Sequence, residues 1–139
     1  MQIQPYLFFQ GRCEEAIGFY KRVLGAKPGR LMHYQDMSEP PPPGMVPLGF
    51  EGKVVYAEFA VGDTRVLACD DYTQTAAAFQ GFRLSLSVAD AAQARHVFAA
   101  LAEGGEVNMP LAKTFFSPCF GMLKDRFGVG WMVIVPGEG

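Results

Sequence analysis

The sequence predicts an α+β protein built from two βαβββ modules. Each half of the chain opens with a run of β-branched and aromatic residues, followed by an amphipathic helical pattern and then by three further strand-like runs. The first module covers about residues 1–71 and the second about residues 81–136. The whole chain of 139 residues has a length that suits one domain.

In the first module, the run Ile3 to Phe9 predicts a strand that ends at a glycine-containing turn. From Glu14, apolar residues recur at helical spacing as far as Leu24, and Gly25 follows where a helix C-cap glycine belongs. The strand-like segments after this helix are RLMHYQDM, KVVYAEFAV and TRVLACD. The predicted order is therefore one strand, one helix and three strands.

The second module repeats this order. The segment GFRLSLSV alternates apolar and polar residues, and Asp90 with Gln93 forms a capping-box-like pair at the start of a helix that ends at Gly104. The strand-like segments that follow are EVNMPL, CFGMLKD and GWMVIV. Residues 15–24 laid over residues 93–102 align apolar with apolar at most positions, which we interpret as an internal repeat.

Two further segments are predicted to be connections. Glu39 to Gly49 contains five prolines, which lack the N–H group that a central strand needs. We therefore expect a polyproline-like loop there, either mobile or ordered by a partner. Asp125 to Gly128 has the chemistry of a type I turn, with an Asp that can accept hydrogen bonds from backbone amides at the first position and a Gly at the fourth.

The composition narrows the possible partners. A net charge of −2 leaves no basic surface of the kind that phosphate backbones require, so we expect no nucleic-acid partner. Cys13, Cys69 and Cys119 are odd in number and lack CxxC spacing, which favours reduced thiols over a disulfide framework or a thiolate zinc site. The chain shows neither a signal-peptide pattern nor an apolar stretch approaching the ~18 residues of a membrane span. We therefore expect a soluble, cytoplasmic protein without a membrane partner.

Three segments carry a resemblance to a known family: PYLFFQGRCEEAIGFYKRVLGA, LSLSVADAAQARHVFAALAEGGEVNMPL and TFFSPCFGMLKDRFGVGWMV. Together they resemble the PhnB-like branch of the vicinal oxygen chelate superfamily, which includes glyoxalase I, bleomycin-resistance and fosfomycin-resistance proteins and extradiol dioxygenases. The resemblance implies that the two modules form a curled mixed sheet around a cleft, the glyoxalase/bleomycin resistance fold. It also implies a homodimer.

In metal-dependent members of the superfamily, His, Gln or Glu side chains bind a divalent ion that acts as a Lewis acid on the substrate. The resemblance places these ligand positions at residues that cannot hold a hard or borderline divalent ion: Pro5, Leu67, Ala68, Phe82, Arg83 and Met132. A slip of one residue would rescue only Gln4. His33 lies on a different predicted strand, and His96 lies on a helix. We therefore expect no metal and no other cofactor in the cleft.

Strand alternation predicts which side chains face the cleft. Tyr56 and Glu58 are expected to face it, whereas Ala57 and Phe59 are expected to face a helix; in the last strand Met132 faces the cleft and Trp131 the helix. The residues expected to line the cleft or its rim are Leu7, Phe9, His33, Tyr56, Glu58, Arg83, Phe115, Phe116 and Met132. Arg83 either pairs with Glu58 or contacts an anionic or carbonyl-bearing ligand. Cys13, at a helix start where the dipole can lower a thiol pKa, is a weaker candidate.

Three functions compete. The first is a protein that binds a small, partly apolar molecule in a metal-free cleft. The second is an enzyme, a lyase, isomerase or transferase that acts on a small oxygenated substrate, with Glu58, His33 or Tyr56 as acid or base, or a metal enzyme with relocated ligands. The third is a structural partner that contacts another protein through its proline-rich loop.

Relatives of this kind are sometimes labelled methyltransferases of ubiquinone precursors. The glycines Gly128 and Gly130 lead into a predicted strand rather than a helix, so they do not form the glycine-rich turn that binds a nucleoside cofactor. The sequence does not identify the ligand, the dimer arrangement or the role of the proline-rich loop, and it does not decide whether the protein is an enzyme.

Overall fold

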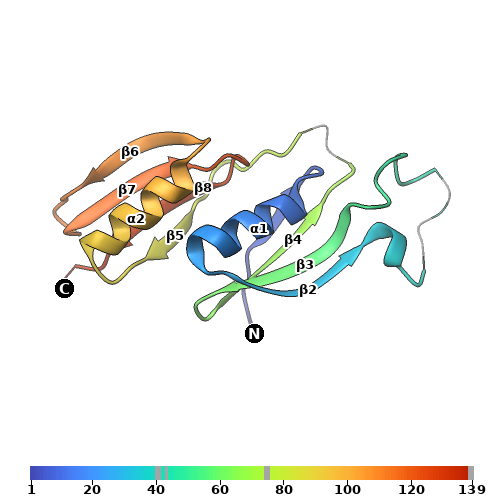
Figure 1. The fold of residues 1–139 in the computed structure, drawn as a ribbon, viewed down its shortest axis with the longest axis horizontal. Coiled ribbons are helices and arrows are strands. Elements are labelled where there is room, and N and C mark those ends of the chain that lie inside the picture. The colour runs from blue at the N-terminus through green and yellow to red at the C-terminus, as the bar shows by residue number, and fades with distance from the viewer. Residues whose placement is uncertain (40–41, 43, 74–75, 138–139) are drawn as a thin grey trace. The chain divides into compact units, whose positions relative to one another are not determined.

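The computed structural model describes residues 1–39, 42, 44–73 and 76–137 (Figure 1). The chain forms two compact units, residues 1–77 and residues 78–139. The expected order of elements, βαβββ in each half, is confirmed. The polyproline-like conformation expected after Glu39 falls in part on Pro40, Pro41 and Pro43, which lie outside the described residues.

The first unit is a four-stranded mixed sheet with one helix. Its elements are β1 (Tyr6–Phe9), α1 (Cys13–Leu24), β2 (Lys27–His33), the 3-10 helix η1 (Tyr34–Asp36), β3 (Val54–Val61) and β4 (Thr64–Asp70). The strand order is β1-β4-β3-β2, in which β1 runs parallel to β4 and the other pairs are antiparallel. Gly25 ends α1 in the left-handed conformation with φ +67°, as predicted for a C-cap.

The second unit has the same plan. Its elements are β5 (Leu84–Ser87), α2 (Ala91–Ala102), β6 (Glu106–Ala112), β7 (Cys119–Lys124) and β8 (Gly130–Val135), with the strand order β5-β8-β7-β6. Strand β5 runs parallel to β8. The predicted cap of α2 is confirmed, because the Asp90 carboxylate accepts a hydrogen bond from the Gln93 amide at 2.8 Å.

The expected boundaries differ from the observed ones at several places, of which two are in the first unit's β1 and β2. The first strand begins at Tyr6 rather than Ile3, whose side chain is exposed. The segment expected to be a strand up to Met37 stops at His33 and continues as η1. A capping box explains this change: Asp36 accepts a hydrogen bond from the His33 amide at 3.1 Å, which closes the turn.

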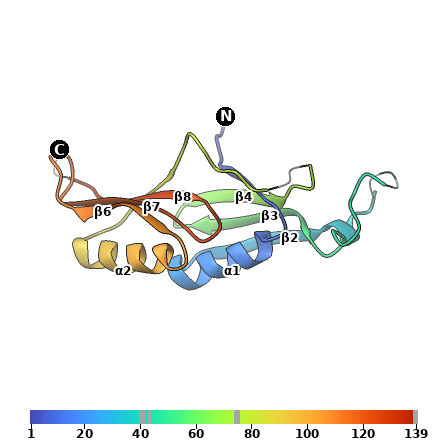
Figure 2. The ribbon, with the colours of Figure 1, turned by 90° about the horizontal axis from the view of Figure 1, so that it is seen from above.

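In each unit the helix lies along one face of the sheet (Figure 2). Under α1, Ala57, Phe59 and Ala68 are at most 1 % exposed, and Tyr20 of the helix stacks on Phe59 with ring centroids 5.5 Å apart. In the second unit the buried strand residues include Leu123, Trp131 and Val133. No helix of the described residues is long and apolar enough to cross a membrane.

A buried carboxylate holds the first unit together. Asp70, at the end of β4, is 1 % exposed. Its Oδ1 accepts hydrogen bonds from the amides of Gly11 at 2.8 Å and Cys13 at 2.9 Å, and its Oδ2 accepts one from the Val54 amide at 2.9 Å. Since Arg12 makes no side-chain cap, Asp70 supplies from another strand the acceptor that the first turn of α1 needs.

The predicted turn at Asp125 to Gly128 is confirmed. The Gly128 amide donates to the Asp125 carbonyl at 2.9 Å, and the Asp125 carboxylate accepts from the amides of Phe127 and Val129. This carboxylate also accepts from the indole N–H of Trp131 at 2.9 Å, which fixes Trp131 on the helix side of β8. The turn therefore sets the direction in which every later residue of β8 points.

Candidate functional site

Each sheet has a second face that no helix of the described residues covers (Figure 2), and we call it the open face. Strand alternation and register decide which side chains lie on it. In the first unit, Tyr6, Leu67 and Glu58 form one row across three neighbouring strands. Beside this row Phe8 lies opposite Cys69, and Tyr56 lies opposite Met32.

An aromatic pair dominates the β1 side of this open face. The rings of Tyr6 and Phe8 stack with centroids 4.8 Å apart and an interplanar angle of 27°. Tyr6 is 37 % and Phe8 45 % exposed, although both are large and apolar. Burial of the phenol and contact with Cys69 raise the pKa of Tyr6, so the hydroxyl stays protonated at neutral pH. The pair offers flat apolar surface to a ligand.

Glu58 is the polar anchor of the same face. Its Oε2 accepts a hydrogen bond from the Tyr56 hydroxyl at 2.9 Å, its Oε1 accepts one from the Arg30 amide at 3.4 Å, and Arg65 Nη1 lies 3.6 Å from Oε2. The side chain passes over Gly29, where an added Cβ would lie 2.9 Å from Glu58 Cγ. These contacts, led by the Tyr56 hydrogen bond, lower the pKa of Glu58, and the same bond raises the pKa of Tyr56.

The structure places Leu7 and Phe9 on the face opposite to the one that we expected. Both are 1 % exposed and lie on the sheet face that α1 covers. Every residue of β1 is apolar or aromatic, so alternation of polarity gives no signal for the direction of its side chains. Tyr6 and Phe8, which sequence reasoning missed, take the places on the open face.

His33 does not join Tyr56 and Glu58. It is paired opposite the buried Val54 on the helix side, where its Nε2 lies 2.8 Å from Glu14 Oε1 and its Nδ1 lies 3.2 Å from Asp36 Oδ2. The hydrogen bond to Glu14, followed by that to Asp36, raises the pKa of His33. His33 thus ties the first turn of α1 to η1, and of the three acid or base candidates only Tyr56 and Glu58 are in contact.

The open face of the second unit is apolar and rich in methionine. Met122 is paired with Met132 on β8 and with Met109 on β6, where the register of β6 shifts on both sides of Met109, and Met132 is paired with Ser85 on β5. A second row contains Ala112, Phe120, Ile134 and Ser87. The expected direction of Met132, away from Trp131, agrees with the burial of the two side chains, since Trp131 is buried and Met132 is half-buried.

Arg83 lies across this face and contacts backbone. Its side chain passes over Gly130, where an added Cβ would lie 3.1 Å from Arg83 Cγ. Its Nη1 donates to the carbonyls of Leu123 at 2.9 Å and Trp131 at 3.4 Å. Of the alternatives for Arg83, pairing with Glu58 has no support among the described contacts, because each residue has its partners within its own unit.

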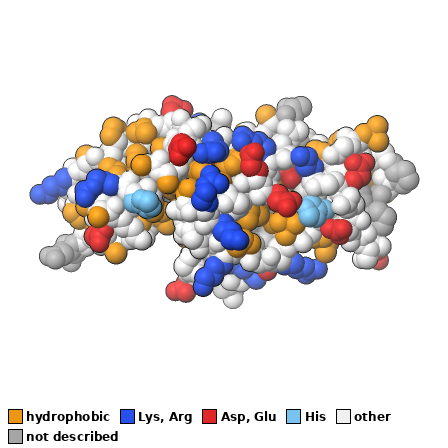
Figure 3. All heavy atoms as spheres, viewed as in Figure 1, with side chains coloured by type: hydrophobic (Ala, Val, Ile, Leu, Met, Phe, Trp, Pro, Cys, Tyr) orange, Lys and Arg blue, Asp and Glu red, His pale blue; other side chains and the backbone are white. Residues whose placement is uncertain are grey.

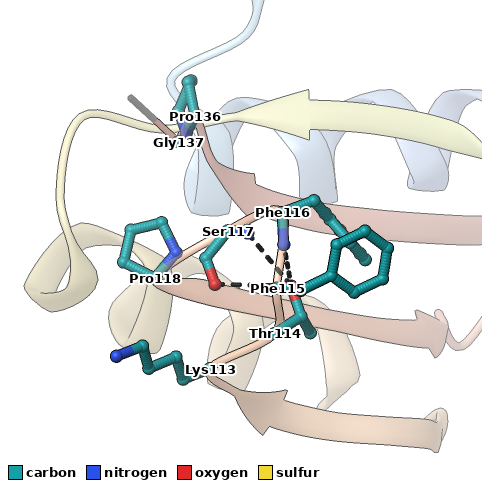
Figure 4. Close-up of a pocket in the computed structure, with 8 residues that line it drawn as sticks. All are labelled: Lys113, Thr114, Phe115, Phe116, Ser117, Pro118, Pro136 and Gly137. Atoms are coloured by element: carbon teal, nitrogen blue, oxygen red, sulfur yellow. Dashed lines mark hydrogen bonds between the residues drawn. The ribbon is translucent and has the colours of Figure 1, made fainter. Parts of the chain in front are cut away.

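Phe115 and Phe116, expected at the rim, lie in a pocket of the second unit with a volume of about 690 Å³ (Figure 4). The lining residues are Lys113, Thr114, Phe115, Phe116, Ser117, Pro118, Pro136 and Gly137. Thr114 Oγ1 shapes the turn by accepting hydrogen bonds from the amides of Ser117 at 3.0 Å and Phe116 at 3.3 Å. Phe115 is fully exposed, whereas Phe116 packs edge-on against Phe120 with centroids 5.0 Å apart.

The cysteines lack the properties of a nucleophile. Burial, followed by the charge of Asp70, raises the pKa of Cys13, which overturns the expectation that the helix dipole could lower it. Burial also raises the pKa of Cys69 to about 11. Cys13, Cys69 and Cys119 are all buried and reduced.

No metal site is evident within residues 1–39, 42, 44–73 and 76–137, where no group of three or more His, Cys, Asp or Glu side chains could hold an ion. Leu67 and Met132, which the resemblance aligns with metal ligands, lie on the open faces and carry neither a carboxylate nor an imidazole. Figure 3 shows acidic, basic and hydrophobic side chains on one face of the described part of the chain.

Comparison with known proteins identifies the family. A family model described as 3-demethylubiquinone-9 3-methyltransferase matches residues 1–134. The solved structure of protein PA1353 from Pseudomonas aeruginosa is 37 % identical, with a TM-score of 0.86 over 99 % of both chains. A Bacillus cereus structure described as a putative 3-demethylubiquinone-9 3-methyltransferase, PhnB protein, is 28 % identical, with a TM-score of 0.80 over 97 % of this chain and 99 % of that one. Protein YjdN of Escherichia coli strain K12 is 31 % identical over 97 % of this chain and 95 % of YjdN.

These matches cover nearly the whole chain, and they agree with the two mixed sheets and with the motifs that suggested the family. The methyl transfer in the family description is not carried over as an activity of this chain. The chain belongs to the PhnB-like family described as 3-demethylubiquinone-9 3-methyltransferase, and its two βαβββ units have the glyoxalase/bleomycin resistance fold of the vicinal oxygen chelate superfamily.

Proposed function

We propose that this protein binds a small, partly apolar molecule in a metal-free site on the open face of its first unit. The observation that carries the proposal is the exposed, stacked pair of Tyr6 and Phe8 on the same face as the Glu58 carboxylate. Flat apolar surface with a single oriented acceptor is the usual chemistry of a small-molecule site. Such a site would hold an apolar body on the rings and a hydrogen-bond donor at Glu58.

The directions in which the pKa values of Glu58 and Tyr56 are shifted favour binding without turnover over acid-base catalysis. A general base works best when its pKa lies near the working pH. The pKa of Glu58 is lowered and the pKa of Tyr56 is raised by their mutual hydrogen bond, so both move away from neutrality. The pair therefore suits recognition, in which Glu58 stays charged and Tyr56 keeps its proton.

The alternative is a lyase, isomerase or transferase that acts on a small oxygenated substrate with Glu58 and Tyr56 as its working groups. The observation that supports this alternative is the hydrogen bond of 2.9 Å from the Tyr56 hydroxyl to the Glu58 carboxylate on the open face. Turnover that depends on pH and is abolished by Glu58→Gln would establish the enzyme. Tight binding that survives with no turnover would establish the binding protein.

The proposal that the site is free of metal rests on donor chemistry. The positions that hold metal ligands in the metal-dependent relatives carry Pro, Leu, Ala, Phe, Arg and Met side chains here.

We further propose that the protein acts in the cytoplasm as a homodimer, as the resemblance implies. Analytical ultracentrifugation would measure the oligomeric state, and a monomer at micromolar concentration would contradict the homodimer.

The binding function can be tested by NMR titration with 2-naphthol, an uncharged molecule that has a flat apolar body and one hydroxyl donor. We expect the largest shifts at residues of the open faces, including Tyr6, Phe8 and Glu58. Glu58→Gln should weaken binding, whereas Glu15→Gln, on the outer side of α1, should leave it unchanged and serves as the matched control. Shifts confined to the helix sides, or no shifts up to the solubility limit, would refute the proposal.

A further inference from the structure

The methionine side chains of the second unit's open face are arranged in a line. Met122 lies directly opposite Met132 across β7 and β8, and Met109 is paired with Met122 across β6 and β7, between two register shifts of the β6–β7 pair. Side chains paired in this way have Cβ atoms about 4.5–5.5 Å apart and share a face. We call Met109, Met122 and Met132 the methionine row. Three of the seven methionines in the chain are thus brought together from three different strands.

The row lies outside the packed core. The residues that alternate with it in β7 and β8, Leu123, Trp131 and Val133, are at most 4 % exposed on the helix side. Met109 is 41 % exposed, and Met122 and Met132 are half-buried. A methionine in a core fills an irregular gap, but these side chains face the uncovered side of the sheet. Their thioethers are therefore accessible to an incoming molecule.

The surroundings of the row favour an uncharged occupant. Beyond Met132, the next residue across the sheet is Ser85 of β5, which carries a neutral hydroxyl. The neighbouring row of the same face contains the apolar residues Phe120 and Ile134. Arg83, a cationic side chain of the same face, donates to the carbonyls of Leu123 and Trp131. A ligand charge placed over the methionine row itself would lose its hydration against thioether side chains that offer no ionic partner.

The thioether sulfur of methionine attracts an aromatic ring more strongly than a saturated ring of the same size. A thioether attracts the edge of an aromatic ring at about 5 Å, and each such contact is worth about 0.3–1.5 kcal/mol beyond apolar burial. Leucine has nearly the same volume and hydrophobicity as methionine but lacks sulfur, so a sheet face selected only for apolarity would not need methionine on three adjacent strands.

We propose that the methionine row is an aromatic-ring subsite of the second unit and that it takes uncharged molecules that carry an aromatic ring. This inference goes beyond the proposed function, because the stacked pair of Tyr6 and Phe8 lies on the first unit. The flexible side chains of the row adjust to the ring edge, while the exposed ring of Phe116, which packs edge-on against the buried Phe120, supplies further aromatic surface.

The test compares 2-naphthol with its saturated analogue decahydro-2-naphthol, which has the same carbon skeleton and hydroxyl but no aromatic ring. Dissociation constants are measured by isothermal titration calorimetry for the wild-type protein, Met122→Leu, Met132→Leu and the double variant. Met45→Leu, which changes an exposed methionine of the first unit, is the matched control. Circular dichroism and the urea midpoint establish that each variant is folded.

We expect the wild-type protein to prefer 2-naphthol over the saturated analogue. The double variant should lose about 3- to 150-fold in affinity for 2-naphthol, because two contacts of about 0.3–1.5 kcal/mol each are removed. Its affinity for decahydro-2-naphthol should stay within about twofold. Equal losses for both alcohols, or equal affinities in the wild type, would overturn the aromatic subsite while leaving the binding function intact. Failure of both alcohols to bind would overturn the binding function as well.

Discussion

Replacing Asp70 tests the hydrogen bonds that join the start of α1 and the start of β3 to the end of β4 in the first unit. The carboxylate accepts three backbone hydrogen bonds, from Gly11, Cys13 and Val54, at 2.8–2.9 Å, and it is 1 % exposed. Asp70→Ala would leave these three N–H groups without their acceptor. Since each unsatisfied buried group costs about 1–3 kcal/mol, the variant should lose at least about 3 kcal/mol of unfolding free energy.

Asp70→Asn separates hydrogen bonding from side-chain volume. The amide oxygen can still accept from Gly11 and Cys13, but the amide NH₂ would face the Val54 N–H, which is also a donor. One charge-assisted bond is lost, so we expect a loss of about 1.5–3 kcal/mol. Asp71→Asn is the matched control, because the hydrogen bonds that Asp71 accepts from Thr73 are exposed.

Urea unfolding followed by circular dichroism measures both losses through the midpoint and the slope. The expected order of stability is wild type and Asp71→Asn, then Asp70→Asn, then Asp70→Ala. A loss below about 1 kcal/mol for Asp70→Ala would refute the reasoning, because it would mean that water replaces the carboxylate at little cost.

Three further predictions concern titration, thiol reactivity and cofactor binding. The pKa of His33 is raised in the folded state. The charged His33 therefore contributes its full share of the unfolding free energy at a pH below the unfolded-state pKa of about 6.5, and this share is lost as the pH rises through the folded-state pKa. The stability difference between wild type and His33→Gln in urea should therefore shrink from pH 5.5 to pH 9, and a constant difference would contradict it. Cys69, buried and with a pKa of about 11, should react with Ellman's reagent far more slowly in the native protein than in urea; equal rates would contradict it. S-adenosylmethionine should show no binding by calorimetry, since Gly130 opens a strand, and saturable micromolar binding would contradict it.

Most of the fold could be predicted because hydrophobic periodicity and turn chemistry act locally. The amphipathic stripe that ends at Gly25, the cap at Asp90 and the turn at Asp125 all have their signals within a few residues of sequence, and the structure contains each of them. The strand β4 matches its predicted segment because turns bound it on both sides, and β8 matches because the turn at Asp125 to Gly128 precedes it.

The candidate site was predicted less well because its geometry depends on long-range register. Alternation of polar and apolar residues predicts that Tyr56, Glu58 and Met132 lie on the open faces. Strand β1 is apolar or aromatic at every position, so alternation does not predict which of its side chains lie on which face. The contacts of His33 with Glu14, and of Arg83 with backbone carbonyls, join residues 19 or more positions apart. No spacing rule in the sequence reports such contacts.

The central claim is that a small, partly apolar molecule binds on the open face of the first unit. Intermolecular nuclear Overhauser effects between 2-naphthol and assigned protein protons test it most directly. We expect effects from the naphthol ring to the ring protons of Tyr6 or Phe8. Effects only to side chains of α1 or α2, such as Phe19 or Phe98, would contradict it.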